Sequence, residues 1–139
     1  MSEISLGIIG GGQLGSMLCI AAKKLDIKTI VYCNDADAPA QNFSDEFIFS
    51  EYDNQEKMFD FVSKVDLITY EFENIPFETL NEINKFKPVL PKPSVNRLIQ
   101  HRLAEKDFIN KLNIRTTRYV LIEKKSEIET LEDFLPGIL

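Results

Sequence analysis

The sequence predicts an α/β fold, a Rossmann-like parallel sheet with helices on both faces. Three observations lead to this prediction. Short apolar runs alternate with amphipathic stretches, a glycine-rich turn joins the first run to the first amphipathic stretch, and polar loops follow the second and fourth runs. Alternating strand and helix signals are typical of parallel sheets, because parallel strands need a crossover that is usually a helix.

Four strands are expected in the first half of the chain. They cover residues 4–9, 28–33, 47–49 and 65–70, which are apolar runs bounded by polar or turn-forming residues. Apolar residues at helical spacing follow the first strand and predict a stripe against the sheet: Leu14, Met17, Leu18, Ala21, Ala22 and Leu25. The helix after the third strand is expected to bury Met58, Phe59 and Val62.

The second half predicts further helices. Pro76 is expected in the first turn of a helix, where a missing N–H is tolerated, and residues 89–90 form a short fifth strand. Ser94 is expected to cap a helix that ends near Leu112. The residues of this helix expected to face inward are Val95, Leu98, Ile99, Leu103, Phe108 and Leu112.

The character of the sequence changes after Asn113. Residues 116–122 alternate like a strand, and residues 126–135 are expected to form a helix begun by a capping serine. We therefore expect one domain over residues 1–113 and the truncated beginning of another over residues 114–139.

Composition excludes several classes of function. The net charge of −6 argues against nucleic-acid binding, which needs a clustered basic surface. Cys19 and Cys33 lie far apart and His101 is the only histidine, so we expect no zinc or haem site. The chain begins without the pattern of a secretory signal, and no apolar run approaches the ~20 residues of a membrane span. We expect a cytosolic protein with no membrane partner.

The glycine-rich turn is the strongest local signal. Gly10, Gly12 and Gly15 fit the pattern Gly-x-Gly-x-x-Gly, which permits a tight turn and a close approach of ligand to backbone. The pattern also fits an NAD(P)-dependent Rossmann oxidoreductase, although the second strand ends at Cys33 and the first acidic residue, Asp35, lies just beyond. A turn that serves only helix packing is a third interpretation.

Two carboxylates follow the fourth strand, at the sheet edge where open α/β folds bind ligands. Glu71 and Glu73 lie on the same side of an extended chain, so either could accept a hydrogen bond from a substrate amine above the glycine turn. Alternatively, one of them caps the helix at Pro76 and the other is solvated.

Two cations lie four residues apart in the last long helix. Arg102 and Lys106 project from the same face and repel each other unless Glu105 or an external anion balances them. A nucleotide phosphate could do so, but spacing alone favours a solvated surface pair.

Four segments occur in the order found in one protein family. They are Gly10–Gly15, Asp37–Ala40, Tyr70–Asn74 and Arg102–Lys106. On these segments the sequence resembles the N5-carboxyaminoimidazole ribonucleotide synthetases, ATP-grasp ligases of purine biosynthesis, over nearly all of its length. The resemblance implies a pre-ATP-grasp substrate domain over residues 1–113 and the beginning of an ATP-grasp domain over residues 114–139.

The resemblance also implies an activity and its site residues. The family uses ATP, Mg²⁺ and bicarbonate to carboxylate the amine of 5-aminoimidazole ribonucleotide, and a homodimer is expected. By this likeness the ribonucleotide-binding residues are Gly12, Gln13, Leu14, Glu71 and Glu73. The residues expected to contact ATP are Arg102 and Lys106.

The chain departs from the family pattern at two positions and in length. Ser16 replaces a basic residue, and His101 replaces an aspartate. No catalytic residue is expected in this chain, and the magnesium ligands are expected beyond its end, so the chain alone should be inactive. A non-catalytic nucleotide-binding module, or an ATP-grasp ligase for another amine, remains an alternative beside the oxidoreductase.

Overall fold

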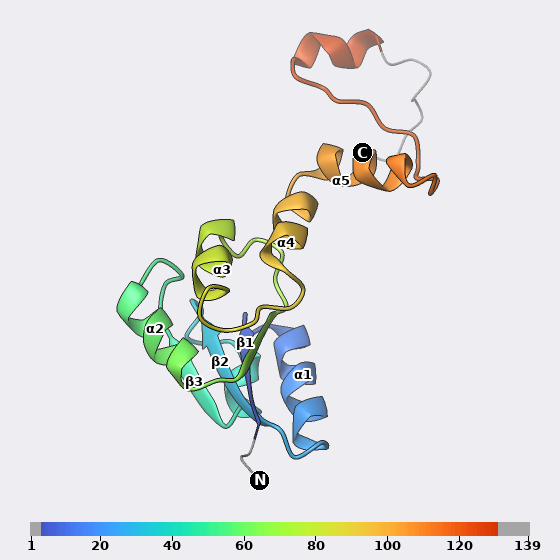
Figure 1. Ribbon diagram of the computed structural model, residues 1–139. Helices are drawn as coiled ribbons and strands as arrows, with labels where there is room; N and C mark the ends of the chain where they lie inside the picture. Colours follow the sequence, from blue (N-terminus) through green and yellow to red (C-terminus); the bar gives the residue numbers. More distant parts are fainter. Residues whose placement is uncertain (1–3, 131–139) are drawn as a thin grey trace. The chain divides into compact units, whose positions relative to one another are not determined.

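A computed structural model describes residues 4–130 of the chain (Figure 1). These residues form two compact units, the first ending at His101 and the second beginning at Arg102. The boundary expected at Asn113, between the substrate domain and the beginning of the ATP-grasp domain, stays a prediction.

The first unit is built on a parallel sheet of four strands. They are β1 (Ser5–Ile9), β2 (Lys28–Cys33), β3 (Glu46–Phe49) and β4 (Leu67–Tyr70), in the spatial order β3-β2-β1-β4. Ile9 pairs with both Tyr32 and Tyr70, so the carboxyl ends of the three neighbouring strands meet at one edge. The strand order reverses beside β1, which is the point where such sheets bind ligands.

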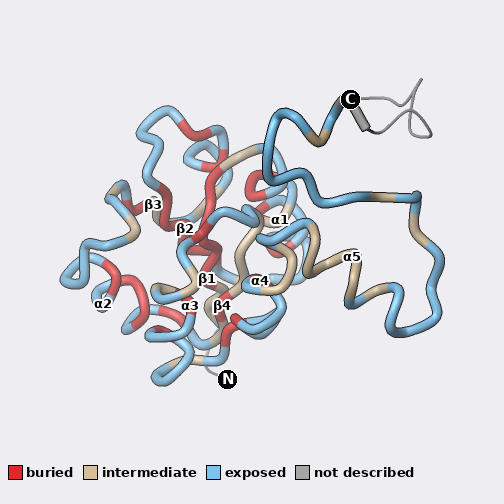
Figure 2. The backbone as a smooth tube through the Cα atoms, turned by 90° about the horizontal axis from the view of Figure 1, so that it is seen from above, coloured by how far each residue is buried: buried red, intermediate tan, exposed pale blue. Residues whose placement is uncertain are grey.

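Helices cover both faces of this sheet (Figure 1). On one face, Ile8 and Val31 pack with Cys19 of α1 (Gln13–Lys23). On the other, Ile9 packs in a cluster with Phe61, and this cluster includes residues of α2 (Gln55–Ser63) and α3 (Phe77–Ile83). Figure 2 shows the buried segments concentrated along the strands between these layers. The predicted α/β fold class is confirmed.

Helix α1 buries mainly its small residues, and the predicted apolar stripe is confirmed only for Ala22, which is buried, and Leu18, which packs partly buried against the core. The buried residues are Gly15, Ser16, Cys19 and Ala22. Leu14, Met17 and Leu25 are instead 57%, 56% and 71% exposed, and Ala21 is exposed as well. A Cβ atom on Gly15 would lie 2.8 Å from a backbone carbonyl oxygen of the preceding turn. The helix therefore lies too close to its neighbours for large side chains.

The single helix expected from Ser94 to Leu112 is divided in two. Helix α4 (Pro93–Ile99) ends the first unit, and α5 (Arg102–Lys111) begins the second. Ser94 is not the cap, because Pro93 takes the first helical position and Lys92 precedes it. Val95, Phe108 and Leu112 were expected inside but are exposed, as is Phe59, which packs edge-on against Phe86.

Four smaller predictions also differ from the structure. Val89 makes one parallel bridge to Ile68 instead of a fifth strand. Pro76 lies just before α3 instead of in its first turn. Within the described residues, 116–122 form no strand. Lys125–Thr130 form a short 3₁₀ helix, and the rest of the helix expected at 126–135 lies outside the described residues.

Helix α2 has a side-chain cap whose removal should be measurable. The Asn54 side chain accepts a hydrogen bond from the Lys57 backbone N–H at 3.1 Å. Asn54→Ala should lower the free energy of unfolding by about 1 kcal/mol, because one N–H at the helix start loses its partner. Urea denaturation followed by circular dichroism measures this loss. Asn54→Asp is the matched control and should stay near wild type, and equal midpoints for all three proteins would contradict the prediction.

No helix within residues 4–130 combines the length and apolar character needed to cross a membrane.

Candidate functional site

Glu71 lies against the glycine turn at the carboxyl edge of the sheet. The Gly12 backbone N–H donates to Glu71 Oε1 at 3.0 Å, and the Glu71 backbone N–H donates to the Ile9 carbonyl at 3.1 Å. The structure thus brings together two of the predicted site residues, Gly12 and Glu71. Both the main chain and the side chain of Glu71 are fixed.

Two glycines make room for this carboxylate. Gly10 has φ +102°, and a Cβ atom there would lie 2.7 Å from Glu71 Oε1. A Cβ atom on Gly12 would lie 3.1 Å from the same oxygen. Of the three pattern glycines, Gly15 fits the interpretation in which glycine serves helix packing. Gly10 and Gly12 serve the carboxylate.

A loop after β2 covers the opposite side of the turn. A Cβ atom on Gly11 would lie 2.8 Å from Ala38 Cβ and 3.1 Å from Cys33 Sγ. The Ala40 N–H, within the 3₁₀ helix η1 (Pro39–Asn42), donates to the Gly11 carbonyl at 2.9 Å. Asp35 accepts a hydrogen bond from the Asp37 N–H at 3.0 Å, within the same loop. The turn is enclosed between this loop and Glu71.

The charge of Glu71 is compensated by the start of α1. Oε1 accepts from Gly12, the residue that precedes this helix, and the partial positive charge of a helix start stabilises a carboxylate. Among residues 4–130, no ion pair includes Glu71. Its second oxygen, Oε2, therefore keeps its capacity to accept a hydrogen bond.

Tyr52 is a neighbour of the site that the sequence did not indicate. Burial raises the pKa of the Tyr52 phenol, and Cys33 and the charge of Glu71 raise this pKa further. Nothing in the spacing of Tyr52 distinguished it, because it follows β3 in a polar loop.

Glu73 differs from Glu71 in its surroundings. Its residue is exposed, and its carbonyl accepts hydrogen bonds from Asn96 Nδ2 at 3.1 Å and Gln100 Nε2 at 2.7 Å. The structure therefore fixes its main chain to α4. The sequence did not indicate these two amides, since polar residues four apart on a helix usually face solvent.

The first residues of α1 divide into exposed and buried positions. Gln13 and Leu14, both predicted to bind the ribonucleotide, are exposed immediately after Gly12. Ser16 is buried, and its hydroxyl donates to the Gly12 carbonyl at 3.1 Å. The short serine side chain fits in this buried position and bonds to the turn. A longer basic side chain would not fit in the same space.

Arg102 and Lys106 lie in the second unit, where each has a local partner. Arg102 Nη1 pairs with Glu105 Oε2 at 2.7 Å and its side chain is 73% exposed. Lys106 Nζ lies 3.3 Å from Thr117 Oγ1 and 5.5 Å from the centre of the Tyr119 ring. These contacts reduce the repulsion expected between the two cations. Their contact with ATP stays a prediction.

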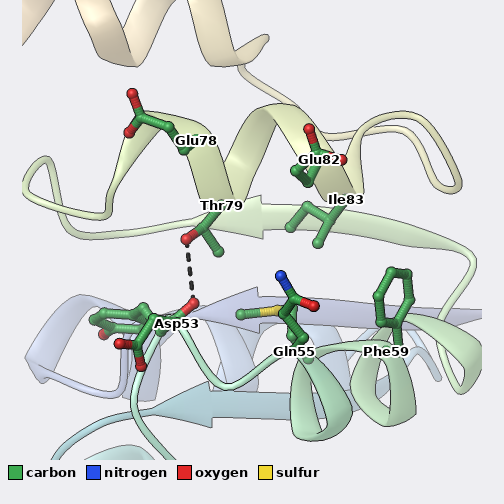
Figure 3. A pocket seen from close by; sticks show the side chains of 9 residues that line it. Asp53, Gln55, Phe59, Glu78, Thr79, Glu82 and Ile83 are labelled. Carbon is green, nitrogen blue, oxygen red and sulfur yellow. Dashed lines mark hydrogen bonds between the residues drawn. The ribbon is translucent and has the colours of Figure 1, made fainter.

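A separate hollow of about 370 Å³ lies between α2 and α3 and contains none of the predicted site residues (Figure 3). Its wall includes Thr79, which donates to the Tyr52 carbonyl at 3.1 Å, and the carboxylate of Glu82, which pairs with Lys85 at 2.6 Å. In the described part of the chain, no three His, Cys, Asp or Glu side chains are grouped as a metal site requires.

The chain is similar to known proteins over most of its length. Residues 1–100 match the family described as the ribonucleotide synthetase preATP-grasp domain. The chain is 36% identical over 126 residues to the bifunctional purine synthesis protein purC/E of Dictyostelium discoideum, covering 91% of this chain and 13% of that protein. It is 35% identical over 124 residues to the N5-carboxyaminoimidazole ribonucleotide synthase of Brucella melitensis, covering 89% of this chain and 34% of that enzyme.

A solved structure is similar over the same part. The Staphylococcus aureus N5-carboxyaminoimidazole synthetase, complexed with ADP, has a TM-score of 0.84 and 30% identity, covering 94% of this chain and 35% of that one. The chain spans about a third of the length of the synthases that it matches.

Proposed function

The chain belongs to the ribonucleotide synthetase preATP-grasp family, and from this premise we propose that its glycine turn and Glu71 bind the ribonucleotide substrate of an ATP-dependent carboxylase. The proposed reaction is the carboxylation of 5-aminoimidazole ribonucleotide by bicarbonate to N5-carboxyaminoimidazole ribonucleotide. The names of the matched relatives support it. The observation that carries the proposal is the hydrogen bond from Gly12 to Glu71.

The geometry of Glu71 suits an amine ligand. One carboxylate oxygen is held by Gly12, so the other can accept a hydrogen bond from the exocyclic amine of a ribonucleotide bound over the turn. A carboxylate in this position orients the amine and stabilises the positive charge that develops on its nitrogen as the carbon–nitrogen bond forms. In this proposal Gln13, Leu14 and Glu73 complete the contacts with the ribonucleotide.

The same bond disfavours a nicotinamide-dependent oxidoreductase. In that class the pyrophosphate of the dinucleotide binds the N–H groups at the helix start. Here Glu71 accepts from Gly12 and would repel a pyrophosphate at the same place. The loop that packs on Gly11 also covers the other side of the turn.

The proposal includes ATP as a second substrate, contacted by Arg102 and Lys106. The complex of the Staphylococcus aureus synthetase with ADP supports this assignment. Bicarbonate and Mg²⁺ complete the reaction, and the magnesium ligands would lie outside residues 4–130. We also propose a cytosolic homodimer. The dimer rests on the family likeness alone, and the cytosol is supported by two free, buried cysteines.

Titration of the chain with two ligands tests the proposal. Calorimetry should give binding heat with 5-aminoimidazole ribonucleotide, with a Kd of about 1 mM or lower. NADH fluorescence should not change on addition of the protein. Circular dichroism verifies that the protein is folded. A folded chain that gives no heat at millimolar ribonucleotide would contradict the proposal, and binding of NADH in its place would favour the oxidoreductase.

A further inference from the structure

Two amide side chains, from Asn96 in α4 and from Gln100 immediately after it, hold the loop that carries the carboxylates. Asn96 Nδ2 donates to the Glu73 carbonyl at 3.1 Å, and Gln100 Nε2 donates to the same carbonyl at 2.7 Å. Gln100 Nε2 also donates to the Ile75 carbonyl at 2.8 Å. Three hydrogen bonds therefore join a short helix to residues 73–75.

Between Glu71 and Ile75, residues 72–74 have few other restraints. Phe72 is 46% exposed, and Glu73 and Asn74 are exposed. The turn bond from the Ile75 N–H to the Phe72 carbonyl is long, at 3.5 Å. The loop is fixed at its start by the bonds of Glu71 to Ile9 and Gly12. Its other end is held by the burial of Ile75 in the core and by the amides of Asn96 and Gln100.

Asn96 occupies a position where an apolar residue would be expected. It is completely buried, and its Oδ1 atom has no hydrogen-bond donor within reach among the described residues. An unsatisfied buried acceptor lowers stability, so the amide is not the most stabilising choice for this position. Within residues 4–130, the Asn96 side chain donates one hydrogen bond, to the Glu73 carbonyl, and this bond indicates a role in placing that residue.

We propose that Asn96 and Gln100 are positioning residues for the ribonucleotide site. They fix the Glu73 carbonyl and thereby the conformation of the loop. In this conformation Glu71 Oε1 accepts the hydrogen bond from the Gly12 N–H, and Oε2 is directed toward the substrate amine. Neither amide contacts the ligand in this arrangement, and both act through the loop. This inference rests on the proposed function of the glycine turn and Glu71.

Two variants test the proposal, with one matched control. Gln100→Met and Asn96→Leu each remove a side-chain donor to the loop and keep a similar volume. Thr79→Val removes the comparable bond to the Tyr52 carbonyl, which lies outside the loop. Each protein is measured by calorimetry with 5-aminoimidazole ribonucleotide, by urea denaturation, and by amide hydrogen exchange at Gly12.

Positioning predicts a specific pattern of results. Gln100→Met and Asn96→Leu should each weaken ribonucleotide binding about fivefold, the equivalent of one lost hydrogen bond. Exchange at Gly12 should become faster in both, because the carboxylate that accepts from this N–H is less firmly placed. Thr79→Val should lower the urea midpoint without changing affinity or Gly12 exchange.

The opposite pattern would overturn the proposal. If the two α4 variants lower only the urea midpoint, as Thr79→Val does, the amides have a structural role alone. If the wild type binds no ribonucleotide, the proposed function fails, but Gly12 exchange still decides whether α4 positions Glu71. Gln100 is exposed, so Gln100→Met does not alter the core. This variant alone can test the proposal if Asn96→Leu does not fold.

Discussion

Glu71→Gln is expected to weaken the binding of 5-aminoimidazole ribonucleotide by about 10- to 100-fold, because a hydrogen bond to a charged group is lost. The glutamine carbonyl can still accept from Gly12, which leaves the amide NH₂ directed at the ligand amine. Two donors then face each other, and the negative charge is absent. Calorimetric titration of the wild type and the variant measures the change.

Two controls accompany this variant. Its free energy of unfolding should fall by about 1 kcal/mol or less, because only the interaction with the helix start is weakened. Glu73→Gln should reduce affinity less, since the Glu73 side chain is exposed and α4 holds only its carbonyl. An unchanged affinity of Glu71→Gln would remove Glu71 from the ribonucleotide site.

Gly10→Ala should have the largest effect on stability, with a fall of about 2–4 kcal/mol in the free energy of unfolding. Two causes add. The φ of +102° strains any residue with a Cβ atom, and that atom would lie 2.7 Å from Glu71 Oε1. The carboxylate must move, so the bond to Gly12 is lost as well. Urea denaturation measures the change.

Gly12→Ala separates the two causes. Gly12 has φ −70°, and its Cβ atom would meet only the end of the flexible Glu71 side chain, at 3.1 Å. We expect a smaller loss of stability than for Gly10→Ala, with ribonucleotide binding weakened in both variants. Equal stabilities of Gly10→Ala and the wild type would show that the turn adapts, contrary to the geometry described.

The strands and layers could be predicted because each strand is an apolar run with a polar boundary. The buried face of α1 could not. Hydrophobic periodicity selects the largest apolar residues, such as Leu14 and Met17, whereas the close approach at Gly15 admits only small ones. The predicted length of the helix after Ser94 was also wrong. The helix breaks after Ile99, where the sequence has no proline or glycine that would indicate an end.

The candidate site was predictable in part. Because parallel strands end at one edge of the sheet, the sequence was enough to predict Glu71 near the glycine turn. The structure has it there. The restraint on the other end of the loop was not predictable. Asn96 and Gln100 follow Glu73 by 23 and 27 residues, and only the folded chain brings their donors to the Glu73 carbonyl.

The close fit between the turn and Glu71 limits how this protein can evolve. A side chain at position 10 needs the space that the carboxylate occupies, and aspartate at position 71 would be one methylene too short to reach Gly12. Substitutions at positions 10, 12 and 71 should therefore have non-additive effects, because these residues share the same space and the same hydrogen bond. Divergence toward a new ligand would have to begin by releasing this carboxylate.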